Sequence, residues 1–121
     1  MTKSTNKKTY DLEERTFEFA KDVRLFIKTL DKTIANIEDS KQVVRSSGSI
    51  GANYIEANES LSKKDFVFRI KISRKEAKES VYWLRLINES NKLTNSDLAK
   101  ELIQESTELK KIFSAIIEKS K

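Results

Sequence analysis

Apolar residues recur at intervals of three and four along most of the chain, which is the period of an amphipathic α-helix. In the first such segment they form one stripe that ends near Leu30 and leaves Phe17 outside it. We expect this helix to begin at Asp11, an N-cap residue that Glu14 follows three positions later as in a capping box. The stripe consists of Leu12, Thr16, Phe19, Ala20, Val23, Phe26, Ile27 and Leu30.

The second segment starts at residues 31–33 and fades near Ser60, but its middle is rich in serine and glycine. Such a run permits either a break or a continuous helix, because each glycine costs about 1 kcal/mol against alanine in a helix. We favour continuity, since small residues spaced by four lie on one helical face. There they would let a neighbouring helix approach closer than the usual 8–10 Å or so. These small residues are Ser47, Gly48, Gly51 and Ala52. The apolar stripe that we predict for this helix is Ile34, Ile37, Val44, Gly48, Gly51, Ala52 and Ile55.

The third segment begins after Ser62, a predicted N-cap with Asp65 three residues on, and runs to about Glu89. It carries two apolar strips where one suffices for the core of a monomer. The second strip indicates a subunit interface, although neighbouring helices of the same chain could also cover it. The main stripe is Phe66, Ile70, Ala77, Val81, Leu84 and Ile87. The second strip is Phe68, Ile72, Trp83 and Leu86.

The fourth segment follows a polar break at residues 91–96, with Ser96 or Asn95 as its cap, and frays after about Glu118. Its predicted stripe is Leu98, Leu102, Glu105, Leu109, Ile112, Phe113 and Ile116. Short connections make sequential helices antiparallel neighbours. The pattern therefore predicts an all-α fold, an antiparallel up-down-up-down four-helix bundle, over residues 10–121. We expect residues 1–9, which are polar, to form a flexible tail.

Composition narrows the possible functions. The length of 121 residues suits one domain, and the chain has no proline, no cysteine and no histidine. Histidine-dependent acid–base and nucleophilic catalysis is thereby excluded, as are thiolate metal sites. No apolar run reaches the roughly 20 residues that cross a bilayer. We therefore expect a cytoplasmic protein without membrane contact, without a cofactor and without enzymatic activity.

Two Glu-x-x-Glu pairs, Glu56 with Glu59 and Glu76 with Glu79, resemble the carboxylate sets of metal sites in bundles. Measured from the turn near Ser62, however, the two pairs differ in height by about 12 Å, which is too far to share a metal. The same height matching predicts a structural charge network between the second and third helices, as opposed to a merely solvated charged face. Its members are Arg45, Asn53, Glu56, Arg69, Glu76 and Glu79.

Basic residues concentrate on the third helix, in a chain whose net charge is +5. Such a cluster can bind the phosphates of RNA or DNA without reading bases. The competing interpretation is that these side chains only face solvent, because no recognition motif accompanies them. The candidate nucleic-acid-binding residues are Lys63, Lys64, Lys71, Arg74, Lys75 and Lys78.

The run from Arg45 to Glu59, RSSGSIGANYIEANE, is followed by Asp65-Phe66, by RKEAKES from Arg74 and by Trp83-Leu84. Together with an Asp-Leu opening at residue 11, this pattern resembles the 23S rRNA intervening-sequence protein family from about Tyr10 to Ile117. The resemblance implies an antiparallel four-helix bundle that assembles as a ring, commonly a pentamer, with no known enzymatic activity. Relatives of that family include the accessory protein of diversity-generating retroelements, a basic pentamer that binds nucleic acid and a reverse transcriptase.

Residues and resemblance lead to one hypothesis and one alternative. The hypothesis is a homo-oligomeric, pentameric scaffold whose basic surface binds RNA or DNA. The alternative is an adaptor that binds only protein, in which the third helix docks a partner and the positive charge serves solubility.

Overall fold

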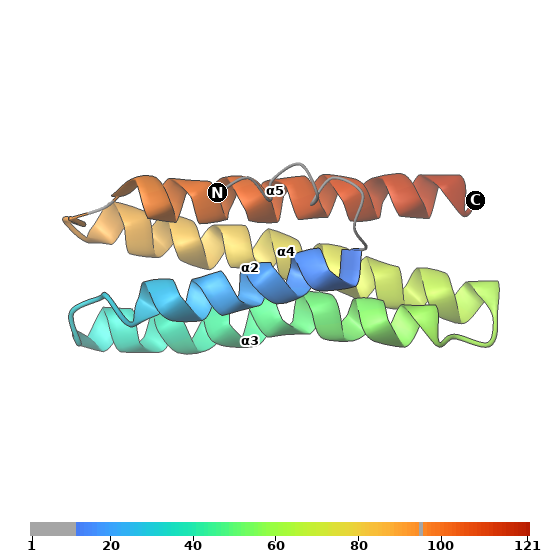
Figure 1. Cartoon of the computed structure of the whole chain (residues 1–121), viewed down its shortest axis with the longest axis horizontal. Coiled ribbons are helices and arrows are strands. Elements are labelled where there is room, and N and C mark those ends of the chain that lie inside the picture. The colour runs from blue at the N-terminus through green and yellow to red at the C-terminus, as the bar shows by residue number, and fades with distance from the viewer. Residues whose placement is uncertain (1–11, 95) are drawn as a thin grey trace.

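The computed structural model describes residues 12–94 and 96–121, which form four helices packed side by side (Figure 1). Successive helices run in opposite directions, so the predicted up-down-up-down bundle is confirmed. None of the helices in these two ranges is both long and apolar enough to cross a membrane. The helices are α2 (Leu12–Ile27), α3 (Ile34–Asn58), α4 (Lys63–Ser90) and α5 (Ser96–Lys119).

Most helix boundaries follow the local sequence. Ser62 caps α4, because its hydroxyl accepts a hydrogen bond from the amide of Asp65 at 3.1 Å, as predicted. Thr33 caps α3 in the same way. The first helix ends at Ile27, three residues before the predicted Leu30, and the Thr29 hydroxyl donates to the carbonyl of Phe26 at that end. Ser96 is the first residue of α5 rather than its cap. The expected tail at 1–9, the cap at Asp11 and the alternative cap at Asn95 lie outside the described residues.

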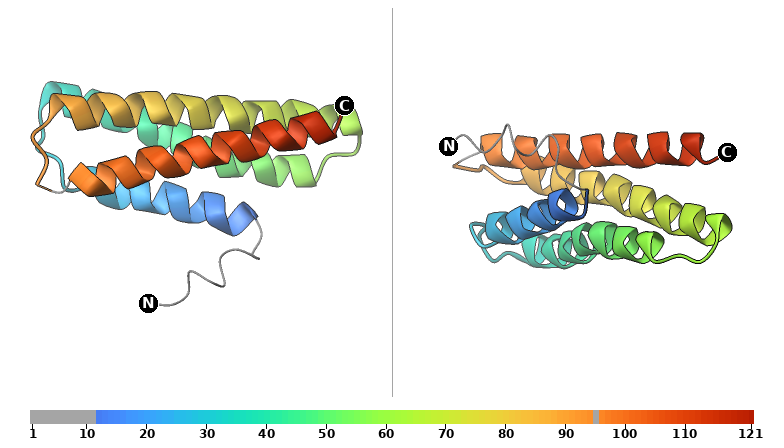
Figure 2. Two further views of the ribbon diagram at one scale, coloured as in Figure 1. Left: turned by 90° about the horizontal axis from the view of Figure 1, so that it is seen from above. Right: turned by 45° about the vertical axis from the view of Figure 1, so that its right-hand side comes forward.

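The core runs the length of the bundle and draws on all four helices. In α2 the buried side chains are Thr16, Phe19, Val23 and Phe26, which confirms the predicted stripe, while Phe17 is exposed. With 16 residues against 25 in α3, α2 covers only part of its neighbour (Figure 2). The interface between α2 and α3 is therefore shorter than that between α3 and α4.

Helix α3 is continuous through its glycine-rich middle, as predicted, but its buried face is not the predicted one. Ile34 is 85% exposed, and Ile37 and Ile55 are also exposed. The residues that point into the bundle are instead Asn36, Val43, Ser46, Ser47, Ile50 and Ala57. The prediction was wrong because it followed the isoleucines, whereas the close contact between α3 and α4 selects small serines.

On α4 the predicted second strip is largely open to solvent. Phe68 is 60% exposed, Leu86 is exposed and Ile72 is half-buried. Trp83 departs from the prediction, since it packs against the core, and the neighbouring Tyr82, which is 58% exposed, takes its place. We call Phe68, Ile72, Tyr82 and Leu86 the outer strip. At 100° per residue these four side chains share one face of α4.

Candidate nucleic-acid interface and interhelix contacts

The six predicted nucleic-acid-binding residues all lie on the outer surface of α4. Five are exposed and Arg74 is half-buried. At 100° per residue the six positions span an arc of about 120° on the helix. None of them forms an ion pair with any described residue. We call this set, Lys63, Lys64, Lys71, Arg74, Lys75 and Lys78, the basic face.

Several cations elsewhere in the described chain, unlike those of the basic face, have a carboxylate partner. Arg15 forms a two-pronged contact with Glu105, at 2.7 and 2.9 Å, that joins α2 to α5. Lys21 pairs with Glu18 at 2.9 Å, and this hydrogen bond raises the pKa of Lys21. Each of these charges is neutralised locally, whereas the charge of the basic face is available to a ligand.

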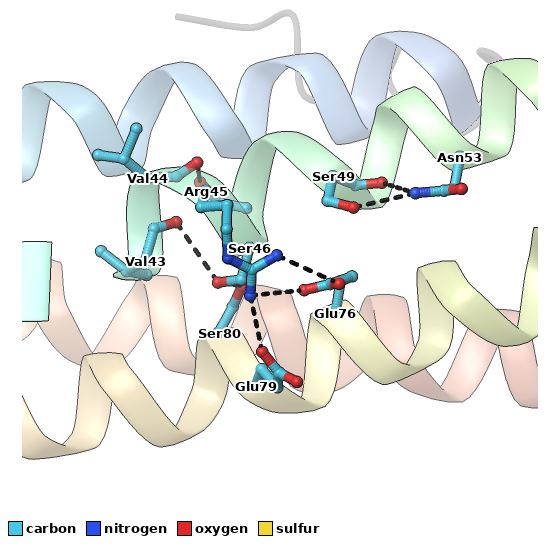
Figure 3. A network of polar contacts seen from close by, with 10 residues as sticks. Val43, Val44, Arg45, Ser46, Ser49, Asn53, Glu76, Glu79 and Ser80 are labelled. Carbon is cyan, nitrogen blue, oxygen red and sulfur yellow. Dashed lines mark hydrogen bonds and ion pairs between the residues drawn. The ribbon is translucent and has the colours of Figure 1, made fainter. Parts of the chain in front are cut away.

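On the side of α4 that meets α3, an ion-pair network joins the two helices (Figure 3). Nη2 of Arg45 lies 2.9 Å from Oε1 of Glu79 and 3.3 Å from Oε1 of Glu76. The side chain of Arg45 is 52% exposed and that of Glu76 only 7%. The hydrogen bond to Glu76 is the main reason why the pKa of Arg45 is raised above its ordinary value. Oε1 of Glu76 is buried without a hydrogen bond of good geometry, so its charge depends on the nearby guanidinium.

A second predicted contact lies about two helical turns away. Nη1 of Arg69 donates to Oδ1 of Asn53 at 3.0 Å, and Asn53 in turn donates to Ser49 within α3. Glu56, which we also predicted in this network, is exposed and makes no side-chain contact of this kind within the described residues. No three His, Cys, Asp or Glu side chains in the described ranges are grouped as metal ligands would be.

The four small residues of α3 have different surroundings. A Cβ added at Gly51 would lie 2.7 Å from Oγ1 and 3.1 Å from Cβ of Thr16 in α2, so α2 packs directly on this glycine. At Gly48 the nearest atom would be Nη2 of Arg24, at 3.2 Å. Ser47 is buried, whereas Ala52 is exposed. Close approach of the two helices thus depends most on Gly51.

Sequence reasoning missed a set of buried hydroxyls between the helices. Ser46 and Ser80 share a hydrogen bond of 2.8 Å between α3 and α4. Ser73 donates to the carbonyl of Ile50 at 2.8 Å. Ser106 of α5 donates to a carbonyl of α4 at 2.7 Å. The spacing of these serines does indicate burial, because they fall on the same helical face as the apolar core residues. A hydropathy pattern nevertheless assigns them to the surface, because serine is polar.

A pair of amide side chains, one buried at Asn36 and one half-buried at Asn91, closes one end of the α3–α4 interface and was also missed. Nδ2 of Asn36 donates to Oδ1 of Asn91 at 2.9 Å, and Nδ2 of Asn91 donates back to Oδ1 of Asn36 at 2.9 Å. Asn36 also donates to the carbonyl of Asp31, and Asn91 to that of Ile87. With Arg69–Asn53, this pair holds α3 and α4 in register over nearly their whole length.

The relatives of the chain agree with this architecture. A model of the 23S rRNA-intervening sequence protein family matches residues 8–115. The chain belongs to this family. The family match includes the basic face, the ion-pair network and the three exposed apolar residues of α4, Phe68, Tyr82 and Leu86. No curated protein matches the chain.

A solved structure extends the family comparison to three dimensions. It is a protein of unknown function from the S23 ribosomal protein family of Bacteroides thetaiotaomicron, with 32% sequence identity and a TM-score of 0.77. The similarity covers 88% of this chain and 98% of that one. This chain thus has the same fold as that solved structure.

Proposed function

We propose that this intervening-sequence family member is a non-enzymatic, homopentameric scaffold of the cytoplasm whose basic face binds RNA or DNA. The observation that carries the nucleic-acid part is the basic face itself: six cationic side chains on one helix without an ion-pair partner among the described residues. Contacts from lysine and arginine to phosphates are electrostatic, and they require no base-specific geometry.

The assembly part rests on a different observation. Phe68 and Tyr82 are each more than half exposed, on a helix whose other face already contributes Ile70, Ala77 and Leu84 to the core. Exposed aromatic side chains that share one face are typical of interaction surfaces. The pentamer is the assembly that the family resemblance implies, and repetition of the basic face around a ring would raise the affinity for a long polyanion through multivalency.

The test compares two quadruple variants of equal charge. The first carries Lys71→Ala, Arg74→Ala, Lys75→Ala and Lys78→Ala. The control removes four exposed lysines outside α4, at Lys41, Lys92, Lys119 and Lys121. Filter binding to a single-stranded RNA and to a DNA duplex is measured from about 50 to about 200 mM salt, because counterion release changes the affinity strongly over this range.

We expect the basic-face variant to lose at least about tenfold in affinity at the lower salt concentration and to reduce the salt slope by about 3. The control should change both quantities much less. Circular dichroism verifies that both variants are folded. Equal losses in the two variants would show that net charge and not this face matters, and binding absent from the wild-type chain would favour the protein-only adaptor.

A further inference from the structure

The exposed apolar residues of the described chain are not scattered. Nine large hydrophobic residues are exposed, and six of them lie on two surfaces only. One surface is the outer strip of α4. The other lies between α2 and α3. The six residues are Phe17, Ile37, Ile55, Phe68, Tyr82 and Leu86.

The surface between α2 and α3 is hollowed at two places. The glycine hollow, of 460 Å³, has Gly48, Gly51 and Ala52 as its floor and is flanked by Phe17 and Ile55. The loop hollow, of 260 Å³, is lined by the apolar residues Ile27, Leu30 and Ile37 together with Ser40, Asn36 and three charged residues of the α2–α3 connection. Both hollows are predominantly apolar.

The outer strip consists of two pairs of side chains, which we call the two projections. Phe68 and Ile72 form one, and Tyr82 and Leu86 form the other. Their centres are 14 residues apart on α4, or about 21 Å at 1.5 Å per residue. The centre of each hollow along α3 is the mean position of the α3 residues that line it. These two centres are also about 14 residues apart, which is again about 21 Å.

The projections and hollows also lie at nearly the same height in the bundle. The hydrogen bonds Arg69–Asn53 and Ser80–Ser46 fix which residues of α4 and α3 are level. By that register the first projection is level with about residue 54 and the second with about residue 40. Each is thus displaced by only about 4 Å from the centre of a hollow.

The outer strip and the two hollows open on adjacent sides of the bundle. Glu79 lies on the same face of α4 as the outer strip and pairs with Arg45, so the strip opens on the α3–α4 side of the bundle. The hollows open on the α2–α3 side. Adjacent sides of a four-helix bundle face directions about 90° apart. When each copy contacts the next through two such surfaces at one height, the copies form a closed ring. The outward directions of the two surfaces of one copy are then about 90° apart in a ring of four and about 108° apart in a ring of five.

We infer that the outer strip of one copy inserts into the two hollows of the next copy. This inference rests on the proposed assembly and specifies its interface as heterologous, with a second copy of this chain as the partner. Phe68 with Ile72 enters the glycine hollow, and Tyr82 with Leu86 enters the loop hollow. Lys71, Arg74 and Lys78 lie on the side of α4 away from α3, so the ring leaves them uncovered.

The first experiment uses charge insertion and mixing. The strip variant is Phe68→Asp with Tyr82→Asp, and the hollow variant is Ile37→Asp with Ile55→Asp. The control is Leu25→Asp with Leu61→Asp, because both leucines are exposed and line neither hollow. Mass is measured by light scattering and sedimentation at high micromolar concentration, after circular dichroism has verified folding.

We expect the wild type and the control to form rings of the same mass, and each charged variant alone to be monomeric. An equimolar mixture of the two charged variants should form a 1:1 heterodimer, since it retains one intact strip and one intact pair of hollows. A mixture that stays monomeric would overturn the heterologous contact.

A second measurement uses the absence of cysteine from the chain. With Phe68→Cys and Ile55→Cys together, a short bismaleimide should give a ladder of covalent species that ends at the ring. Either substitution alone should give no ladder, and Phe68→Cys alone giving dimers would indicate strip-to-strip contact instead.

The outcomes also separate this inference from the proposed function. A monomeric wild-type chain would refute the assembly itself. A ring that survives both charged variants would refute only the interface. A strip variant that remains a ring but no longer binds RNA would assign the outer strip to nucleic-acid stacking, and would equally overturn the inference.

Discussion

Gly51→Ala tests how closely α2 and α3 pack. Thr16 stands opposite this glycine, and a new Cβ would lie 2.7 Å from its Oγ1. Thr16 is 1% exposed, and its hydroxyl is held by a 2.9 Å hydrogen bond to the carbonyl of Glu13, so it cannot rotate away freely. The two helices would have to separate.

The magnitude follows from two opposing terms. Alanine in place of glycine stabilises a helix by about 1 kcal/mol, and overpacking a buried contact costs about 1–3 kcal/mol. Gly48→Ala provides the matched control in the same helix, because its nearest obstacle, at 3.2 Å, is the far end of the long Arg24 side chain. The helix-propensity term cancels between the two variants. We therefore expect Gly51→Ala to be less stable than Gly48→Ala by about 1–3 kcal/mol.

Urea unfolding followed by circular dichroism measures this difference, with all variants at the same protein concentration since assembly contributes to stability. Adding Thr16→Ala to Gly51→Ala removes the closest atom and should recover about 1 kcal/mol or more relative to additivity. If Gly51→Ala unfolds at the same or a higher urea concentration than Gly48→Ala, the proposed steric contact is refuted.

Two further predictions concern the α3–α4 interface. Arg45→Met should cost about 1–3 kcal/mol because it leaves the buried carboxylate of Glu76 without its cation, and adding Glu76→Met should restore most of that stability in a double-mutant cycle. An additive cycle would show that the pair is not coupled. Asn36→Asp should destabilise the bundle by about 2 kcal/mol at pH 7, because an ionised carboxylate cannot donate to Asn91. Its deficit relative to wild type should shrink as pH falls from neutral towards about 4, because the acid is protonated in the folded protein before it is in the unfolded chain and can then donate again; a deficit independent of pH would contradict the donor role.

The sequence predicts the fold well because α-helical periodicity, short connections and the cap at Ser62 are local signals. The continuity of α3 through Gly48 and Gly51 follows from spacing, and the Arg45–Glu76 contact follows from counting residues outward from one turn. Each of these inferences needs only the geometry of a single helix or of a helical hairpin.

The buried face of α3 could not be predicted in the same way. Hydrophobicity assigns Ile34 to the core and Ser46 to the surface, but the structure does the opposite. Ser46 is buried because its hydroxyl finds Ser80 across the interface, and this partner is known only once the register is fixed. The outer strip and the two hollows are likewise properties of neighbouring helices together, so no single stripe reveals that they match.

The position of Trp83 gives the molecule an intrinsic optical probe. It is the only tryptophan in the chain, it is half-buried, and its ring meets that of Tyr82 edge to face at a centroid distance of 5.0 Å. Excitation of the tyrosine therefore transfers efficiently to the indole, whose emission wavelength depends on the water around it. Covering the outer strip would shift that emission to the blue, so unlabelled protein reports by its own fluorescence whether this side of α4 is covered.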